Sequence, residues 1–158
     1  ESEKLYPNYK SCFSISLNTW GKEVDFNNVI ERIKLINKLG YGVLVYGNPL
    51  FDDFHENIMK KYDKTIVYPM GTDTNNRYIE SNPNFKLPNR KFVISTRKGS
   101  GFNSDPEMMK ISDLIEINVD ISATNIRNAM IDNEEDIIKY QIPDELVNEL
   151  DDFKKTLK

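Results

Sequence analysis

The chain has 158 residues, of which 39% are hydrophobic and 29% charged, and its net charge is −4. This length suits one globular domain with a core of its own, and no apolar run approaches the roughly 18 residues that a membrane helix needs. The acidic balance argues against a nucleic-acid partner, and the single cysteine, Cys12, excludes an internal disulfide and predicts a cytoplasmic protein.

Short apolar runs alternate along the chain with segments of helical periodicity, as in α/β proteins. The runs predict strands over residues 12–18, 42–46, 64–70, 91–97 and 113–119. The periodic segments predict helices over 25–39, 51–62 and 74–80, another from near 122, and a charged helical tail from about 134. Together they predict one Rossmann-like domain over residues 1–158, with about five parallel strands in a sheet and helices on both faces.

Residues 120–127 end a predicted strand and begin a helix with small hydroxyl side chains. The first N–H groups of a helix lack intrahelical partners, and the positive helix end suits a phosphate. Ser122 and Thr124 can add hydroxyl donors, and Arg127 lies one turn further along. A capped helix with an exposed arginine explains the same residues without a ligand.

This segment, DISATNIR, resembles the I-S-S-T-x-I-R signature of the adenylyltransferase branch of nucleotidyltransferases. The motif MGTDT, with Gly71 and Asp73, resembles the G-x-D-T element of that family, and Arg77 matches an arginine that often follows it. Arg97 lies where many members have a strand that ends in R-x-G. The segment FSISLN with Lys22 resembles an F-E-I-S-I-x-N-x-x-K element of a nicotinamide-nucleotide adenylyltransferase or cytidylyltransferase-like subgroup, and NPLF (48–51) resembles the turn that follows its next strand.

The resemblance implies adenylyl transfer, in which the phosphate of nicotinamide or nicotinate mononucleotide attacks the α-phosphorus of ATP and pyrophosphate leaves. ATP and a mononucleotide are the implied partners, and Mg²⁺ bound to phosphates is the implied cofactor. The implied phosphate-binding residues are Ser122, Thr124 and Arg127. The implied nucleotide-binding residues are Gly71, Asp73, Arg77 and Arg97, and the implied second-substrate residues are Asn18, Trp20 and Lys22. Trp20 could stack on a ring of the ligand or pack within its own loop.

The sequence departs from the family at its catalytic loop. The family has H-x-G-H after its first strand, and here the single histidine, His55, lies on a predicted helix without a glycine partner. We expect His55 to be exposed to solvent, and we expect the carboxylate pair Asp52-Asp53 to form a solvated face. No catalytic residue is therefore assigned.

Three interpretations remain open. In the first, the chain is a fragment or a degenerate member that lacks the first family strand. It is then inactive alone, and one central strand of its sheet lacks a neighbour. In the second, it is a nucleotide-binding pseudoenzyme. Or it is a sister transferase with a different nucleotide or acceptor, such as a cytidylyltransferase or a phosphopantetheine adenylyltransferase.

Overall fold

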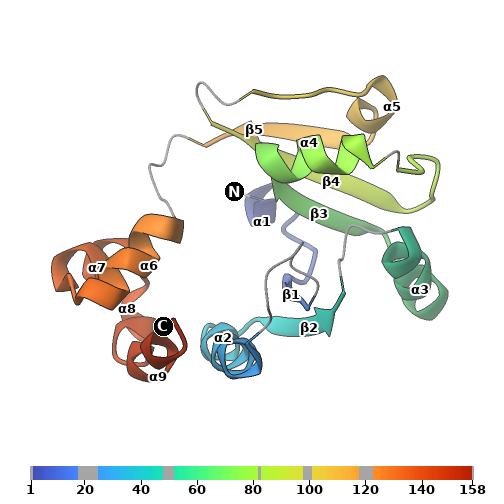
Figure 1. Cartoon of the computed structure of the whole chain (residues 1–158). Helices are drawn as coiled ribbons and strands as arrows, with labels where there is room; N and C mark the ends of the chain where they lie inside the picture. Colours follow the sequence, from blue (N-terminus) through green and yellow to red (C-terminus); the bar gives the residue numbers. More distant parts are fainter. Residues whose placement is uncertain are drawn as a thin grey trace. The chain divides into compact units, whose positions relative to one another are not determined.

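The computed structural model describes residues 2–17, 25–47, 52–81, 83–97, 101–117 and 123–157. The chain divides into two compact units (Figure 1). The first unit comprises residues 1–9 and 48–118, and the second comprises residues 10–47 and 119–158. None of the described helices is long and apolar enough to cross a membrane.

The first unit is built on a three-stranded parallel sheet in the order β3-β4-β5. Its elements are α1 (Ser2–Leu5), α3 (Asp52–Tyr62), β3 (Ile66–Gly71), α4 (Thr72–Glu80), β4 (Arg90–Thr96), α5 (Pro106–Met109) and β5 (Ser112–Glu116). Neighbouring strands run parallel because α4 lies between β3 and β4 in the chain and α5 lies between β4 and β5. The β3–β4 register runs from the Ile66–Arg90 pair to the Gly71–Ser95 pair.

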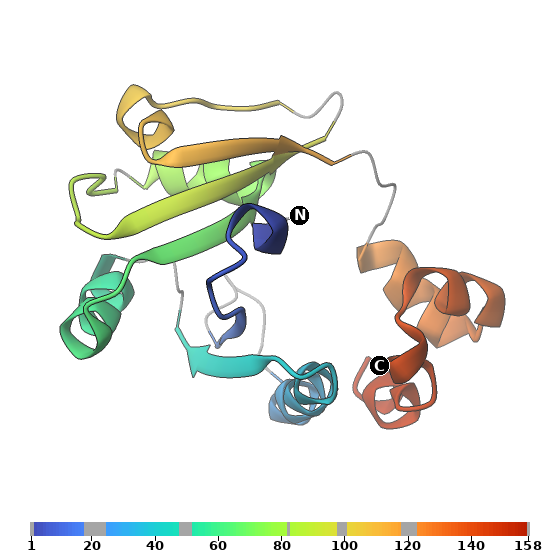
Figure 2. The ribbon, with the colours of Figure 1, turned by 180° about the vertical axis from the view of Figure 1, so that it is seen from behind.

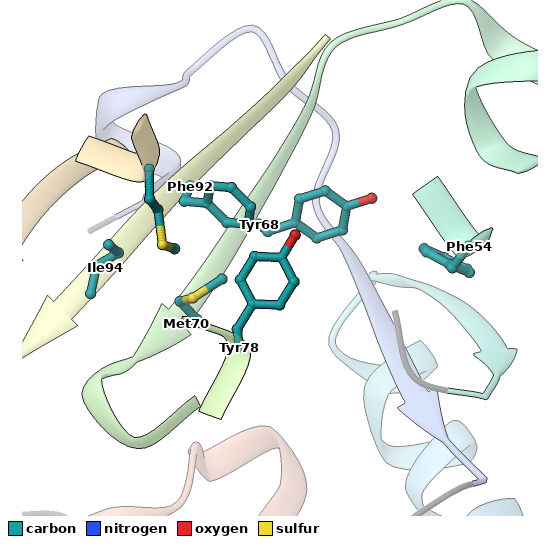
Figure 3. Packing of buried hydrophobic residues seen from close by; sticks show 7 residues of the cluster. Phe54, Tyr68, Met70, Tyr78, Phe92 and Ile94 are labelled. Atoms are coloured by element: carbon teal, nitrogen blue, oxygen red, sulfur yellow. The ribbon is translucent and has the colours of Figure 1, made fainter. Parts of the chain in front are cut away.

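The core of the first unit lies on one face of this sheet. Side chains alternate along a strand, so Tyr68 and Met70 of β3 share a face with Phe92 and Ile94 of β4. Helices α3, α4 and α5 each contribute one buried side chain to the hydrophobic cluster on this face (Figure 3). The complete cluster is Phe54, Tyr68, Met70, Tyr78, Phe92, Ile94 and Met108.

The N-terminal segment covers part of the opposite face. The Tyr6 hydroxyl, directly after α1, donates a hydrogen bond to the Asp113 carboxylate on β5. The Lys91 ammonium on β4 lies 5.8 Å from the centroid of the Tyr6 ring. Lys91 and Asp113 alternate with the core-facing residues of their strands, and the two ribbon views accordingly place α1 on the face away from α4 (Figures 1 and 2).

Strand β3 carries a proline whose backbone faces away from β4. The backbone N–H of Ile66 donates to the Asn89 carbonyl at 2.9 Å, on the β4 side. Backbone groups alternate in direction along a parallel strand, so Val67, Pro69 and Gly71 turn theirs to the other side. Proline lacks an N–H and fits a sheet at such an edge. In the described part of the chain, β3 pairs with β4 and with no second strand.

The second unit holds a parallel strand pair and most of the helical residues. Its elements are β1 (Cys12–Ser16), α2 (Phe26–Lys38), β2 (Gly42–Tyr46), α6 (Ala123–Asp132), α7 (Glu135–Gln141), α8 (Asp144–Val147) and α9 (Leu150–Lys155). Asp25 caps α2, since its carboxylate accepts from the Asn27 N–H at 2.9 Å. The helix gives way to Gly40, whose φ of 80° suits a residue without a Cβ atom.

The C-terminal helices pack against one another and against α2. Their buried cluster is Ala129, Met130, Ile138 and Leu150, with Leu35 of α2 packed against it. Two polar contacts add to this packing. The Asn28 amide donates to the Thr156 hydroxyl at 2.8 Å, and Lys38 forms an ion pair of 3.1 Å with Glu149. The helical C-terminal segment therefore belongs to the same compact unit as the β1–β2 pair.

The predicted α/β class is confirmed. All five strands formed by the described residues are parallel, and helices flank the sheets, consistent with a Rossmann-like fold. The strands belong to two sheets, β1 with β2 and β3 with β4 and β5. Within the ranges that the structure describes, β4 has a strand on both sides, and each of the other four strands has one neighbour. The missing family strand itself stays a prediction.

Candidate functional site

The candidate site lies at the carboxyl ends of β3 and β4. Register places Gly71, the last residue of β3, beside Ser95 of β4. Helix α4 begins directly after β3 with Gly71 as its N-cap, a residue that has no side chain to cap the helix. A helix start carries a positive partial charge, and open α/β sheets bind ligands at the carboxyl ends of their strands. This end of the sheet is therefore suited to an anionic ligand.

Two hydroxyl groups fix the geometry of these strand ends. The buried Thr72 donates from its hydroxyl to the Ser95 carbonyl at 3.2 Å. The Ser95 hydroxyl donates to the Met70 carbonyl, also at 3.2 Å. Each bond joins the end of β3 or the start of α4 to β4, so the two hydroxyls hold the end of the sheet together.

The four predicted nucleotide-binding residues all belong to the first unit and are all exposed. Gly71 ends β3, Asp73 lies in the first turn of α4, and Arg97 directly follows β4. Arg77 lies four residues after Asp73, on the same side of α4. The fold thus brings two motifs that are separate in sequence to one end of one sheet. Their role in binding stays a prediction.

Two asparagines of α4 hold the segment that leads from β4 to α5. The Asn76 amide donates to the Gly101 carbonyl at 3.0 Å and accepts from the Asn103 N–H at 2.9 Å. The Asn75 amide donates to the Asn103 carbonyl at 2.8 Å. Asn75 is fully buried, and its side-chain oxygen has no hydrogen-bond partner among the described residues. These contacts fix the chain beyond the β4 loop against the helix that starts at the candidate site.

The predicted phosphate-binding residues fall in the second unit. Helix α6 begins at Ala123, close to the predicted start. Thr124 lies in its first turn and Arg127 about one turn further along, and both are exposed. Ser122, and the predicted second-substrate residues Asn18, Trp20 and Lys22, lie outside the described residues.

His55 is buried, so the predicted solvent-exposed position is wrong. It is 1% exposed on α3, beside Phe54. Its Nδ1 lies 3.0 Å from the Tyr68 hydroxyl, and its Nε2 lies 2.8 Å from the Pro88 carbonyl. His55 lies three residues before Ile58, which packs against the same core. Residues three apart share a helix face, so this spacing is the sequence signal that His55 is buried.

Asp52 belongs to an ion pair, so the predicted solvated face is also wrong at this residue. Arg90 Nη1 lies 2.8 Å from Asp52 Oδ1, and the arginine side chain is only 2% exposed. Asp52 Oδ2 accepts from the Asn84 N–H at 2.9 Å, and Oδ1 accepts from the Tyr78 hydroxyl at 3.2 Å. Burial raises the pKa of Asp52, but the hydrogen bonds and charge of these neighbours outweigh it and hold the pKa below its usual value.

This polar cluster lies away from the candidate ligand site. Arg90 is the first residue of β4 and pairs with Ile66, the first residue of β3, whereas Gly71 and Ser95 pair at the carboxyl ends. The cluster therefore supports the packing of α3 and of the segment before β4. Sequence reasoning missed it because its partners are up to 38 residues apart.

No protein-family model and no curated protein sequence matches this chain. The family resemblance thus rests on the sequence motifs quoted above. Across the described ranges, no group of three or more His, Cys, Asp or Glu side chains is placed to hold a metal ion.

Proposed function

We propose that this chain is nucleotidyltransferase-like and binds ATP at the carboxyl ends of β3 and β4. One observation carries the proposal. The Gly71–Ser95 pairing brings the Gly71–Asp73 motif and Arg97 to the same end of a parallel sheet, at the start of a helix whose N-cap is a glycine. The intact reaction would be adenylyl transfer to nicotinamide or nicotinate mononucleotide.

The chemistry of these residues matches a nucleotide. The Asp73 carboxylate can accept hydrogen bonds from ribose hydroxyls, and the Arg97 guanidinium can donate to phosphate oxygens. A phosphate-binding role for Ser122, Thr124 and Arg127, which belong to the second unit, is a separate proposal that rests on the family resemblance. Asn18, Trp20 and Lys22 would contact the mononucleotide. The protein would contribute positioning and electrostatic stabilisation, with no covalent intermediate.

Magnesium would accompany ATP by binding its phosphates, where it neutralises charge. The described residues offer it no ligand cluster, so no step is assigned to it. A catalytic histidine is also missing from the proposal. His55 is the single histidine, and both of its nitrogens are engaged inside the first unit.

Substitutions at the site should weaken ATP binding without unfolding the protein. We expect Asp73→Asn and Arg97→Gln each to raise the Kd for ATP about tenfold or more, because a hydrogen bond to a charged group contributes about 1.5–3 kcal/mol. Isothermal titration calorimetry measures the Kd. Lys61→Gln is the matched control, since Lys61 is exposed at the far end of α3, and it should leave the Kd unchanged. Equal ATP affinity in all four proteins would contradict the assignment of this site.

The chain should also turn over little or no substrate. Loss of one transition-state donor costs on the order of 10²–10³ in rate, and here the whole H-x-G-H element has no counterpart. The measurement is a coupled assay of NAD formation from nicotinamide mononucleotide, ATP and Mg²⁺. We expect the chain to bind ATP without forming NAD. This result would favour a protein that binds nucleotide over an active adenylyltransferase. Rapid NAD formation would show that adenylyl transfer proceeds here without the family's histidines.

A further inference from the structure

Two neighbouring asparagines of α4 hold the chain that follows the candidate site. Asn76 donates from its amide to the Gly101 carbonyl at 3.0 Å, and its side-chain oxygen accepts from the Asn103 N–H at 2.9 Å. Asn75 donates to the Asn103 carbonyl at 2.8 Å. Both backbone groups of Asn103 are thus bound by side chains of one helix. We call these hydrogen bonds of Asn75 and Asn76 to Gly101 and Asn103 the asparagine clamp.

Asn75 is buried in a way that packing alone does not explain. Its side chain is fully buried, and its amide also donates to the Asn76 oxygen at 3.2 Å. Its own oxygen has no hydrogen-bond partner in the described part of the chain. A buried polar atom without a partner is unfavourable, and natural proteins depart from such local rules at functional sites. The stability of α4 therefore does not account for this asparagine, whereas the placement of Asn103 does.

The clamp holds one end of a short connection whose other end lies at the candidate site. Strand β4 ends at Thr96, whose carbonyl accepts from the Ile117 N–H at 2.9 Å. Arg97 comes next, and Asn76 holds the chain again at Gly101. A short connection with both ends held has few conformations, so the clamp restricts the positions open to Arg97.

We propose that Asn75 and Asn76 are positioning residues for the proposed nucleotide site, which limit the positions of Arg97 relative to Asp73 and the start of α4. The inference rests on the proposed function, which assigns Asp73 to the ribose and Arg97 to the phosphates of ATP. Helix α4 carries both Asp73 and the clamp, so one element sets the positions of both groups. Groups that are already in place bind a ligand more tightly, because less conformational entropy is lost on binding.

The first test removes both hydrogen bonds of Asn76. Asn76→Ala should still fold, since Asn76 is only half-buried and alanine favours a helix more than asparagine does. We expect hydrogen exchange at the Asn103 N–H to become about fivefold faster, because that N–H loses its acceptor. The Kd for ATP, measured by isothermal titration calorimetry, should rise about threefold. Asn57→Ala, at an exposed position of α3, is the matched control and should leave both values unchanged.

A double-mutant cycle shows whether Asn76 acts through Arg97. If it does, adding Asn76→Ala to Arg97→Gln should change the Kd for ATP very little, because the side chain that Asn76 positions is already gone. An equal rise in both backgrounds would overturn the proposal, since a general loss of stability affects both alike. The coupling is reciprocal, so saturating ATP should slow exchange at the Asn103 N–H of the wild type about threefold. This last measurement needs no variant and decides the question if Asn76→Ala does not fold.

The outcomes also separate this inference from the function on which it rests. If the wild type does not bind ATP, the proposed function fails and the positioning role fails with it. If the wild type binds ATP and Asn76→Ala binds it equally well, only the positioning role is overturned. The clamp would then serve the packing of residues 101–103 against α4 alone.

Discussion

Replacing Asp52 with alanine should lower the free energy of unfolding by about 3 kcal/mol, because it leaves Arg90 charged and without its carboxylate partner. The arginine side chain is 2% exposed, and among the described residues its other hydrogen bond goes to the Asn84 carbonyl. Its guanidinium also lies over the rings of Tyr78 and Phe92, 5.7 and 5.5 Å from their centroids, so it cannot reach water without disturbing the core. Asp52 is 30% exposed, so we expect the loss of stability to lie at the lower end of the range seen when one partner of a buried ion pair is removed. Urea denaturation measures the loss.

Two further variants test the cause of this effect. Asp53→Ala changes the exposed neighbour on the same helix and should cost less than about 0.5 kcal/mol. Asp52→Ala combined with Arg90→Met should recover part of the loss, because it removes the uncompensated charge. A double variant that is less stable than Asp52→Ala alone would show that Arg90 contributes mainly through contacts other than the ion pair.

Phe92→Ala should have the largest effect in the apolar core, about 3–5 kcal/mol of unfolding free energy. Phe92 is 1% exposed at the middle of the first unit's cluster. Its ring centroid lies 5.8 Å from that of Tyr68 and 5.6 Å from that of Tyr78 (Figure 3). Truncation to alanine opens a cavity between the neighbouring strands and the helices that cover them. The cavity cannot close unless these strands and helices move.

Leu114→Ala provides the matched control for this truncation. Leu114 lies on the core-facing side of β5, in register with Ile94, but is 49% exposed. Its removal should therefore cost about 1 kcal/mol or less, in the same denaturation experiment. If Phe92→Ala and Leu114→Ala lowered the free energy of unfolding equally, Phe92 would not be the main contributor to the stability of this core.

Local sequence patterns predicted the main elements well. Strand β2, Gly42–Tyr46, coincides with the predicted apolar run at 42–46, although most of its residues are exposed in the structure. Helix α2, Phe26–Lys38, lies within the predicted range 25–39, between its Asp25 cap and Gly40. The four-residue helices α1 and α5 are too short to show a period. The start of α5 nevertheless carries a local signal, since Asp105 caps it and Pro106 occupies its first turn.

Pairings between distant residues could not be predicted in the same way. Charged residues on a helix usually face water, so the contact of Asp52 with Arg90, 38 residues away, has no local signature. The same holds for His55, whose partners lie on β3 and before β4. For the candidate site, the sequence placed Gly71 and Asp73 after one strand and Arg97 at the end of another, and the parallel sheet places them at one end. The ligand at that end remains a proposal.

Pro69 limits how a second strand can add to the edge of β3. The segment IVYPMG is mostly apolar and β-prone, and such six-residue segments can stack into amyloid when every backbone group finds a partner in the next chain. A foreign strand that adds to β3 on the side away from β4 meets no N–H at Pro69. The intermolecular ladder is interrupted in its middle, and the proline acts as a gatekeeper at this edge.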